Sequence, residues 1–151
     1  MSEIDKQIAD IFAERLCELM QESRISVDVI AQQLQLNSSA FYKWIRKVSV
    51  PNFDNAILLA NYFNCSLDYL FGLNDIDVQY SLHAPILPFN EHFVKILQEK
   101  NISEYRLVKK TGVARSKIAS WRKGTSLPSM HSLIAVATAL GITLDELTDR
   151  I

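Results

Sequence analysis

The sequence predicts an all-α protein built from two tandem five-helix domains, and three observations support this prediction. Sliding the 151-residue chain along itself by 77 residues aligns two similar halves without a gap. Apolar residues recur at helical spacing in both halves, between recognisable helix caps. The chain contains only four glycines and four prolines, a composition typical of globular proteins with a helical preference.

Identical residues at equivalent positions define the repeat. They form the pairs Phe12 and Phe89, Ile25 and Ile102, Ser26 and Ser103, Ser39 and Ser116, Trp44 and Trp121, Pro51 and Pro128, Ala60 and Ala137, Leu67 and Leu144, Asp68 and Asp145, and Leu70 and Leu147. Each half has about 63 residues, which suffices for one small domain around a single core. We therefore predict domains at residues 1–74 and 89–151. The segment between them, 75–88, contains two prolines and no helical period, and is predicted to be a linker with a weak strand signal at Val78, Tyr80 and Leu82.

Helix boundaries follow from capping residues. In the second half we expect a helix over 115–123 and another over 131–140, the latter ended by Gly141. The last helix should begin with a capping box formed by Thr143 and Glu146. Serine caps are expected at Ser26, Ser66 and Ser103, and the opening helix should start near Ile4.

The apolar positions of these helices are the candidate core. In the first half they are Phe41, Trp44, Leu58, Leu59, Phe63 and Leu67, and in the second half the first helix contributes Phe89, Phe93, Ile96 and Leu97. Cys17 and Cys65 lie among apolar residues without CxxC spacing, so both are expected to be reduced core residues.

Several classes of function find no support in the sequence. The three histidines, His83, His92 and His131, lack metal-ligand spacing, and no nucleophile, base and oxyanion donor form a recognisable set. We expect no enzyme, no metal, no cofactor and no small-molecule ligand. The longest aliphatic stretch, 133–140, is too short to span a bilayer, so we expect no membrane contact and a cytoplasmic location.

Two short helices separated by three or four residues form a helix-turn-helix unit, and its second helix faces the partner. In the segment 115–123, Ile118 and Trp121 fall on one side at 100° per residue. The opposite arc, of roughly 140°, holds small and hydrogen-bonding residues. These are Arg115, Ser116, Ala119, Ser120 and Lys123. Arginine, serine and alanine suit the base edges of the major groove.

The charge is concentrated around this segment. From Arg106 to Gly124 there are seven basic residues, including Lys117, and no acidic residue, although the whole chain has a net charge of −1. Residues 89–151 carry ten Lys and Arg against six Asp and Glu, whereas residues 1–74 carry six against nine. The equivalent arc in the first half is Ser38, Ser39, Tyr42, Lys43 and Arg46. A local basic surface of this kind favours binding to phosphates.

The pattern ISxxxLxxxxGVxRSxIxxWxxGxxxPSxxxLxxxAxALGxxLDEL in the second half resembles the Cro/phage-repressor (XRE) helix-turn-helix family. LANYFNCSLDYLFGLND in the first half resembles the last two helices of the same family. The resemblance implies lambda-repressor-like domains that bind double-stranded DNA as a homodimer and regulate transcription, with repression as the expected output. By position it implies base-reading roles for Arg115, Ser116 and Ser120, and for Ser38, Ser39 and Lys43.

The sequence departs from the family pattern at several positions. The family often has a phosphate-binding Gln where this chain has Val27 and Glu104. Gln35 replaces the turn glycine in the first half, which costs about 1 kcal/mol if the backbone is left-handed. Ala114 cannot cap the helix that follows it, whereas Asn37 can.

A second function remains open on the sequence alone. One or both domains could be protein-interaction modules, with the first half mediating dimerisation or binding a partner. The acidic balance of the first half and four aromatic residues favour this alternative. The aromatic residues are Phe41, Tyr42, Trp44 and Phe53.

Overall fold

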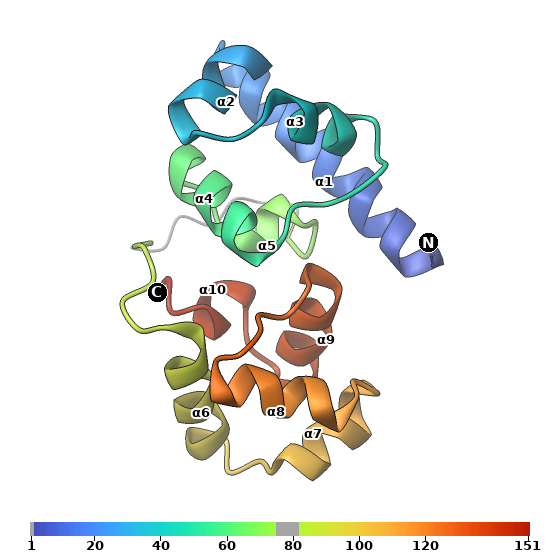
Figure 1. Ribbon diagram of the computed structural model, residues 1–151, viewed down its shortest axis with the longest axis vertical. Helices are drawn as coiled ribbons and strands as arrows, with labels where there is room; N and C mark the ends of the chain where they lie inside the picture. The colour runs from blue at the N-terminus through green and yellow to red at the C-terminus, as the bar shows by residue number, and fades with distance from the viewer. Residues whose placement is uncertain (1, 75–81) are drawn as a thin grey trace. The chain divides into compact units, whose positions relative to one another are not determined.

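The computed structural model describes residues 2–74 and 82–151. The chain divides into two compact units, Met1–Gln79 and Tyr80–Ile151. Within the described residues every regular element is a helix, which confirms the all-α prediction (Figure 1). The first half of the predicted linker, residues 75–81, lies outside the described residues, and so do Val78 and Tyr80 of the weak strand signal.

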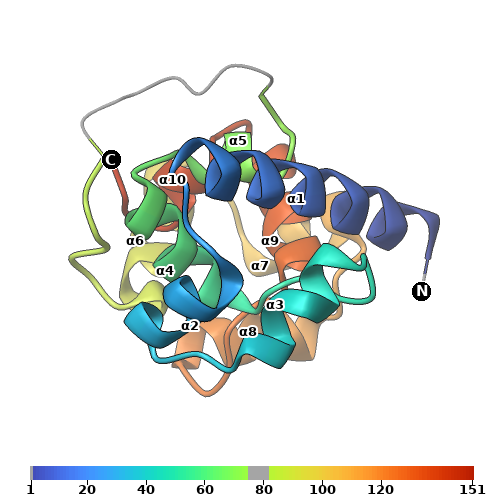
Figure 2. The same ribbon diagram turned by 90° about the horizontal axis from the view of Figure 1, so that it is seen from above.

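Five helices form the first unit: α1 (Glu3–Glu22), α2 (Val27–Leu34), α3 (Ser38–Ile45), α4 (Phe53–Phe63) and α5 (Leu67–Leu70). The short helix α3 packs against both α1 and α2, while α5 packs against α1 and α4. Figure 2 shows α1 as the longest helix of this unit, with α2 and α3 following it in the chain. The start of α1 at Glu3 agrees with the predicted start near Ile4.

The second unit repeats this order with α6 (Phe89–Glu99), α7 (Glu104–Thr111), α8 (Arg115–Lys123), α9 (Met130–Leu140) and α10 (Leu144–Leu147). Helix α8 packs against α6 and α7, α7 packs against α9, and α10 packs against α6 and α9. The bounds of α7, α9 and α10 each lie 77 residues beyond those of α2, α4 and α5. The five-helix count predicted for each half is therefore observed.

The predicted caps are present. The side chains of Ser26, Ser66 and Ser103 each accept a hydrogen bond from the amide three residues later, at 3.3, 3.0 and 3.1 Å. Thr143 accepts from the amide of Glu146 at 3.0 Å, which is one of the two bonds of a capping box. Gly141 ends α9 in the left-handed region, with φ of 67°.

Each unit has its own aromatic core around one tryptophan. Trp44 and Trp121 are 3% and 2% exposed, which confirms that both are core residues. Phe12 meets Trp44 edge-on with ring centroids 6.1 Å apart, and Phe93 meets Trp121 at the same distance in a similar geometry. Among the other predicted core residues, Leu58 and Phe63 are only half-buried.

One core prediction is wrong. Cys65 is fully buried, but Cys17 is exposed, and neither cysteine forms a disulfide within the described residues. Helix α1 buries the stripe formed by Phe12, Leu16 and Leu19. Cys17 follows Leu16 by one residue and is rotated about 100° away from this stripe, so it faces solvent.

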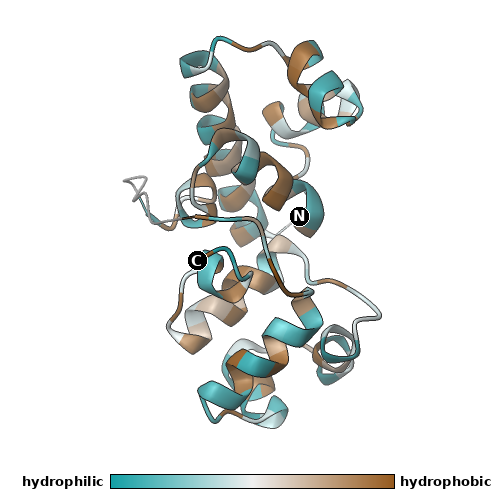
Figure 3. Cartoon of the chain, turned by 90° about the vertical axis from the view of Figure 1, so that its left-hand side faces the viewer, coloured by the Kyte–Doolittle hydropathy of each residue, from teal (hydrophilic) through white to brown (hydrophobic). Residues whose placement is uncertain are grey.

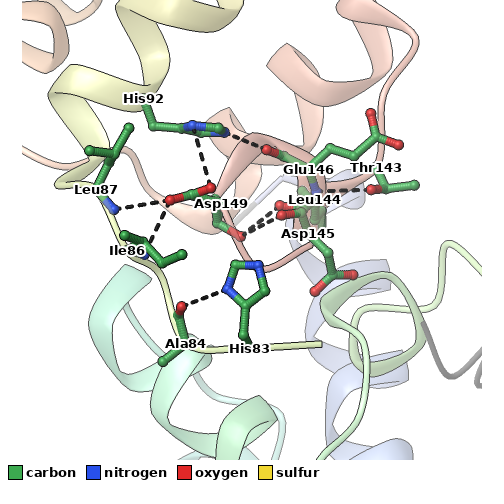
Figure 4. A network of polar contacts seen from close by, with 11 residues as sticks. His83, Ala84, Ile86, Leu87, His92, Thr143, Leu144, Asp145, Glu146 and Asp149 are labelled. Atoms are coloured by element: carbon green, nitrogen blue, oxygen red, sulfur yellow. Dashed lines mark hydrogen bonds and ion pairs between the residues drawn. The ribbon is translucent and has the colours of Figure 1, made fainter. Parts of the chain in front are cut away.

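The described part of the predicted linker, residues 82–88, is hydrogen-bonded to the C-terminal end of the second unit (Figure 4). The amide of His83 donates to the carbonyl of Arg150 at 2.8 Å. The amides of Ile86 and Leu87 both donate to Oδ2 of Asp149, at 3.1 and 3.0 Å. This segment therefore lies along its own unit and is held there by the end of the chain.

A buried histidine adjoins the same carboxylate. Nε2–H of His92 donates to the carbonyl of Glu146 at 2.6 Å, and Nδ1 lies 3.8 Å from Oδ1 of Asp149 (Figure 4). Burial raises the pKa of Asp149, but the amides of Leu87 and Ile86, and the nearby His92 and His83, together lower this pKa below its ordinary value of 3.8. The carboxylate is therefore stabilised in its ionised form.

We expect Asp149→Asn to lower the stability of the second unit at pH 7 by about 1 kcal/mol, because hydrogen bonds to a charged acceptor are stronger than those to an amide. Asn tolerates the left-handed backbone at this position, where φ is 61°. Since the folded pKa is depressed, the contribution is present above pH 3.8 and is lost as the pH falls through the folded pKa. Thermal denaturation of both proteins between pH 7 and pH 2 should show the two curves converging in acid; a constant difference would contradict this role.

A second buried ionic contact was not predicted from the sequence. Arg150 forms an ion pair with Asp145, and their side chains are 1% and 2% exposed. The equivalent of Arg150 in the first unit is Leu73, which is 44% exposed. The end of the second unit is thus fixed by polar contacts of two successive residues, Asp149 and Arg150.

Candidate nucleic-acid interface

Helices α7 and α8 are joined by a three-residue turn, residues 112–114. Gly112 has a φ of 72°, and a Cβ atom at this position would meet nothing within 4 Å, so the backbone angle alone explains the glycine. The hydroxyl of Thr111 donates to the carbonyl of Leu107 at 2.7 Å and accepts from the amide of Val113 at 3.2 Å. These bonds fix the start of α8 relative to α7.

Helix α8 has one buried side and one open side. Ile118 and Trp121 are 0% and 2% exposed and anchor the helix in the core. Arg115, Ser116, Lys117 and Lys123 are exposed, while Ala119 and Ser120 are half-buried. The predicted division of this helix is confirmed, and Figure 3 shows hydrophilic and hydrophobic residues side by side along the helices.

The hydroxyl of Ser120 is already engaged as a donor. Its Oγ donates to the carbonyl of Ser116 at 2.9 Å, one turn earlier in the same helix. A serine hydroxyl has one proton and two lone pairs, so Ser120 keeps its capacity to accept. In the major groove it would suit the amino group of adenine or cytosine.

The ends of α8 differ in how they are held. Ala114 provides no side-chain hydrogen bond at the start of the helix, as predicted from the alanine at this position. At the other end Gly124 adopts a φ of 79°, and a Cβ atom there would lie 3.1 Å from Cγ of Asn90. The C-terminal end of α8 is thus packed closely against α6, while its N-terminal end stays open.

An ion pair connects the start of α7 to the end of α8. The carboxylate of Glu104 accepts from Nε of Arg122, and the two side chains are 20% and 45% exposed. This pairing was not predicted, because Glu104 is recognisable in the sequence only as a departure from the family pattern. Its isolation was the available signal, because it is the only acidic residue from Lys100 to Gly124.

In the first unit the corresponding helices, α2 and α3, meet at Gln35. This residue has φ of 56° and ψ of 39°, so the predicted left-handed conformation of a non-glycine residue is confirmed. Asn37 caps α3 by accepting from the amide of Ser39 at 3.1 Å, also as predicted. Of the residues predicted to contact DNA, Ser38 is half-buried and the others are exposed: Ser39, Tyr42, Lys43 and Arg46.

The aromatic residues of the first unit give little support to a partner-binding surface. Phe41, Trp44 and Phe53 are 0%, 3% and 7% exposed, so these three belong to the core. Only Tyr42 is exposed, at 46%. Of the four aromatic residues that favoured the interaction alternative, three therefore anchor helices from inside, as predicted for Phe41 and Trp44, and only Tyr42 is available to a partner.

Within residues 2–74 and 82–151, no group of three or more His, Cys, Asp or Glu side chains is arranged to hold a metal ion. None of the helices in this part of the chain combines the length and apolar character needed to cross a bilayer.

Comparison with known proteins supports the same region. Residues 92–151 match the sequence model of the Cro/C1-type HTH DNA-binding domain. The match begins within α6 and includes all of α7, α8, α9 and α10. No curated protein and no solved structure matches the chain. The second unit is thus similar to a helix-turn-helix DNA-binding domain, whereas the resemblance of the first unit to this family stays a prediction.

Proposed function

We propose that this protein is a sequence-specific DNA-binding transcriptional regulator, rather than an enzyme, and that it represses transcription by occupying a promoter. The observation that carries the proposal is the arrangement of α8. Ile118 and Trp121 fix the helix in the core, and its open side presents basic and small residues within the matched DNA-binding domain.

Each residue on the open side of α8 has a chemical role in this proposal. Arg115 pairs bidentately with guanine, Ser116 bonds a base edge, and Ser120 accepts from an amino group. Lys117 and Lys123 neutralise phosphates, which fixes the position of the protein but carries no sequence information. These residues lie on the helix that enters the major groove in helix-turn-helix proteins.

We further propose that two chains bind as a homodimer, each contributing α8 to one half-site. Half-sites one turn apart are about 34 Å between centres. The alternative is one chain that places α3 and α8 in the two half-sites, and the number and spacing of half-sites recovered from selected DNA distinguish the two arrangements.

The first unit either binds DNA through α3 or mediates assembly. For DNA binding it offers Ser38, Ser39, Tyr42, Lys43 and Arg46. For assembly it offers an acidic balance of nine against six residues in 1–74 and several exposed apolar side chains. The most exposed of these are Ile4, Tyr42 and Val48, at 56%, 46% and 57%.

Selection of bound sites from random DNA with the full chain, followed by gel-shift titration, tests the proposal. Arg115→Ala with Ser120→Ala should weaken binding to the selected site by about 30-fold or more, since each good base contact contributes about 1–3 kcal/mol of discrimination and the variant removes two. For the wild type, contacts to about six phosphates predict that log K falls with log salt at a slope near −5.

The comparison is Ser39→Ala with Lys43→Ala in the first unit, at the positions equivalent to Ser116 and Ser120. If only the Arg115 and Ser120 pair matters, the first unit is an accessory to DNA binding. Failure of the wild type to enrich any sequence, or binding that ignores salt, would overturn the proposed function.

A further inference from the structure

We infer that Glu104 withholds Arg122 from the DNA backbone and thereby weakens binding to all DNA sequences by one phosphate contact. This inference rests on the proposed function and extends it to the control of affinity. It starts from the ion pair between the first turn of α7 and the last turn of α8.

Arg122 is placed where it could reach a phosphate. It follows Arg115 by seven residues, so on a helix of 100° per residue the two lie about 20° apart. It therefore borders the open side of α8, and its side chain is 45% exposed. A partly exposed arginine at this border is suited to contact the backbone of a duplex whose bases are read by its neighbours.

Arg122 is instead paired with Glu104. The carboxylate of Glu104 accepts from Nε of Arg122, so the charge of the pair is cancelled where the two helices meet. The segment from Lys100 to Gly124 contains eight basic residues and this single acidic one. The only acidic residue of the basic segment is thus joined to one of its arginines.

The first unit shows that an ion pair is not needed to hold these helices together. The residues equivalent to Glu104 and Arg122 are Val27 and Ile45, at the same offset of 77, and both are half-buried. Helices α2 and α3 pack against each other with this uncharged pair. An uncharged pair therefore suffices for the packing of these two helices in the first unit.

Arg122 also has space to leave its partner. A hollow of about 470 Å³ adjoins the pair and is bordered by Ile102, Arg106 and both members of the pair. Release of Arg122 would add one cation to the surface that faces DNA. Because phosphate contacts carry no sequence information, binding to specific and to random DNA should increase by the same factor.

Glu104→Gln tests the inference in the full chain, by titration of the selected site and of random-sequence DNA at several salt concentrations. We expect the slope of log K against log salt to become steeper by about 0.9, and both DNAs to bind roughly eightfold tighter at 0.1 M salt. In the Arg122→Gln background, the same substitution should no longer steepen the slope.

Glu91→Gln is the matched control, since Glu91 is an exposed residue in the first turn of α6 and the change in net charge is the same. It should leave the slope unchanged. Thermal denaturation of each variant checks that the second unit is folded. An unchanged slope for Glu104→Gln, or an equal gain in the Glu91→Gln protein or the Arg122→Gln background, would overturn the inference even though the wild type binds DNA.

Discussion

Asp145→Ala should destabilise the second unit by about 3–5 kcal/mol, because it leaves the guanidinium of Arg150 buried without its carboxylate. A unit of about 70 residues has a total stability of only about 3–10 kcal/mol. The variant should therefore be partly or wholly unfolded in its second unit at 37 °C. Urea denaturation followed by circular dichroism measures the loss.

The control for this variant removes both charges. Asp145→Ala with Arg150→Leu places at position 150 the residue that the first unit has at the equivalent position, Leu73. Replacing both members of a buried ion pair by apolar residues is often neutral or stabilising, so most of the lost stability should return. If the double variant were as unstable as the single one, the ion pair would not be the cause.

Trp121→Ala should remove about 3–5 kcal/mol from the second unit by deleting its largest core side chain, which meets Phe93 edge-on. The chain has two tryptophans, so Trp44 becomes the sole tryptophan of this variant and reports on the first unit. We expect the helical signal of the second unit to be lost in urea well before the fluorescence of Trp44 changes.

Trp121→Phe serves as the comparison for this variant, because it keeps an aromatic ring beside Phe93 and should cost less than the alanine substitution. The experiment also asks whether the two cores are independent. Simultaneous loss of the circular dichroism signal and the Trp44 signal in Trp121→Ala would show that the two units unfold together.

Local patterns in the sequence predicted the fold well. Ser26, Ser66, Ser103 and Asn37 act within three residues along the chain, so their caps could be recognised from spacing alone. The two sides of α8 follow from the period of the helix, with Ile118 and Trp121 on the buried side. Such features depend on the local chain and not on distant contacts.

The parts that sequence reasoning missed depend on contacts between distant residues. Asp149 meets amides more than sixty residues earlier in the chain, and no local pattern predicts this pairing. Glu104 and Arg122 are joined because α7 and α8 pack together, which only the structure shows. Cys17 was misplaced for a simpler reason, since its apolar neighbours concealed its position beside the buried stripe.

Hydrogen bonds join residues 83–87 to Asp149 and Arg150, so the second folded unit includes residues before α6. A fragment starting at Phe89, the first residue of α6, would omit the three amides that these two residues bind. In such a fragment the side-chain carboxylate of Asp149, next to the imidazole of His92, would lack the amide hydrogen bonds of Ile86 and Leu87. The natural autonomous fragment therefore starts before His83 and keeps the final residues of the chain intact.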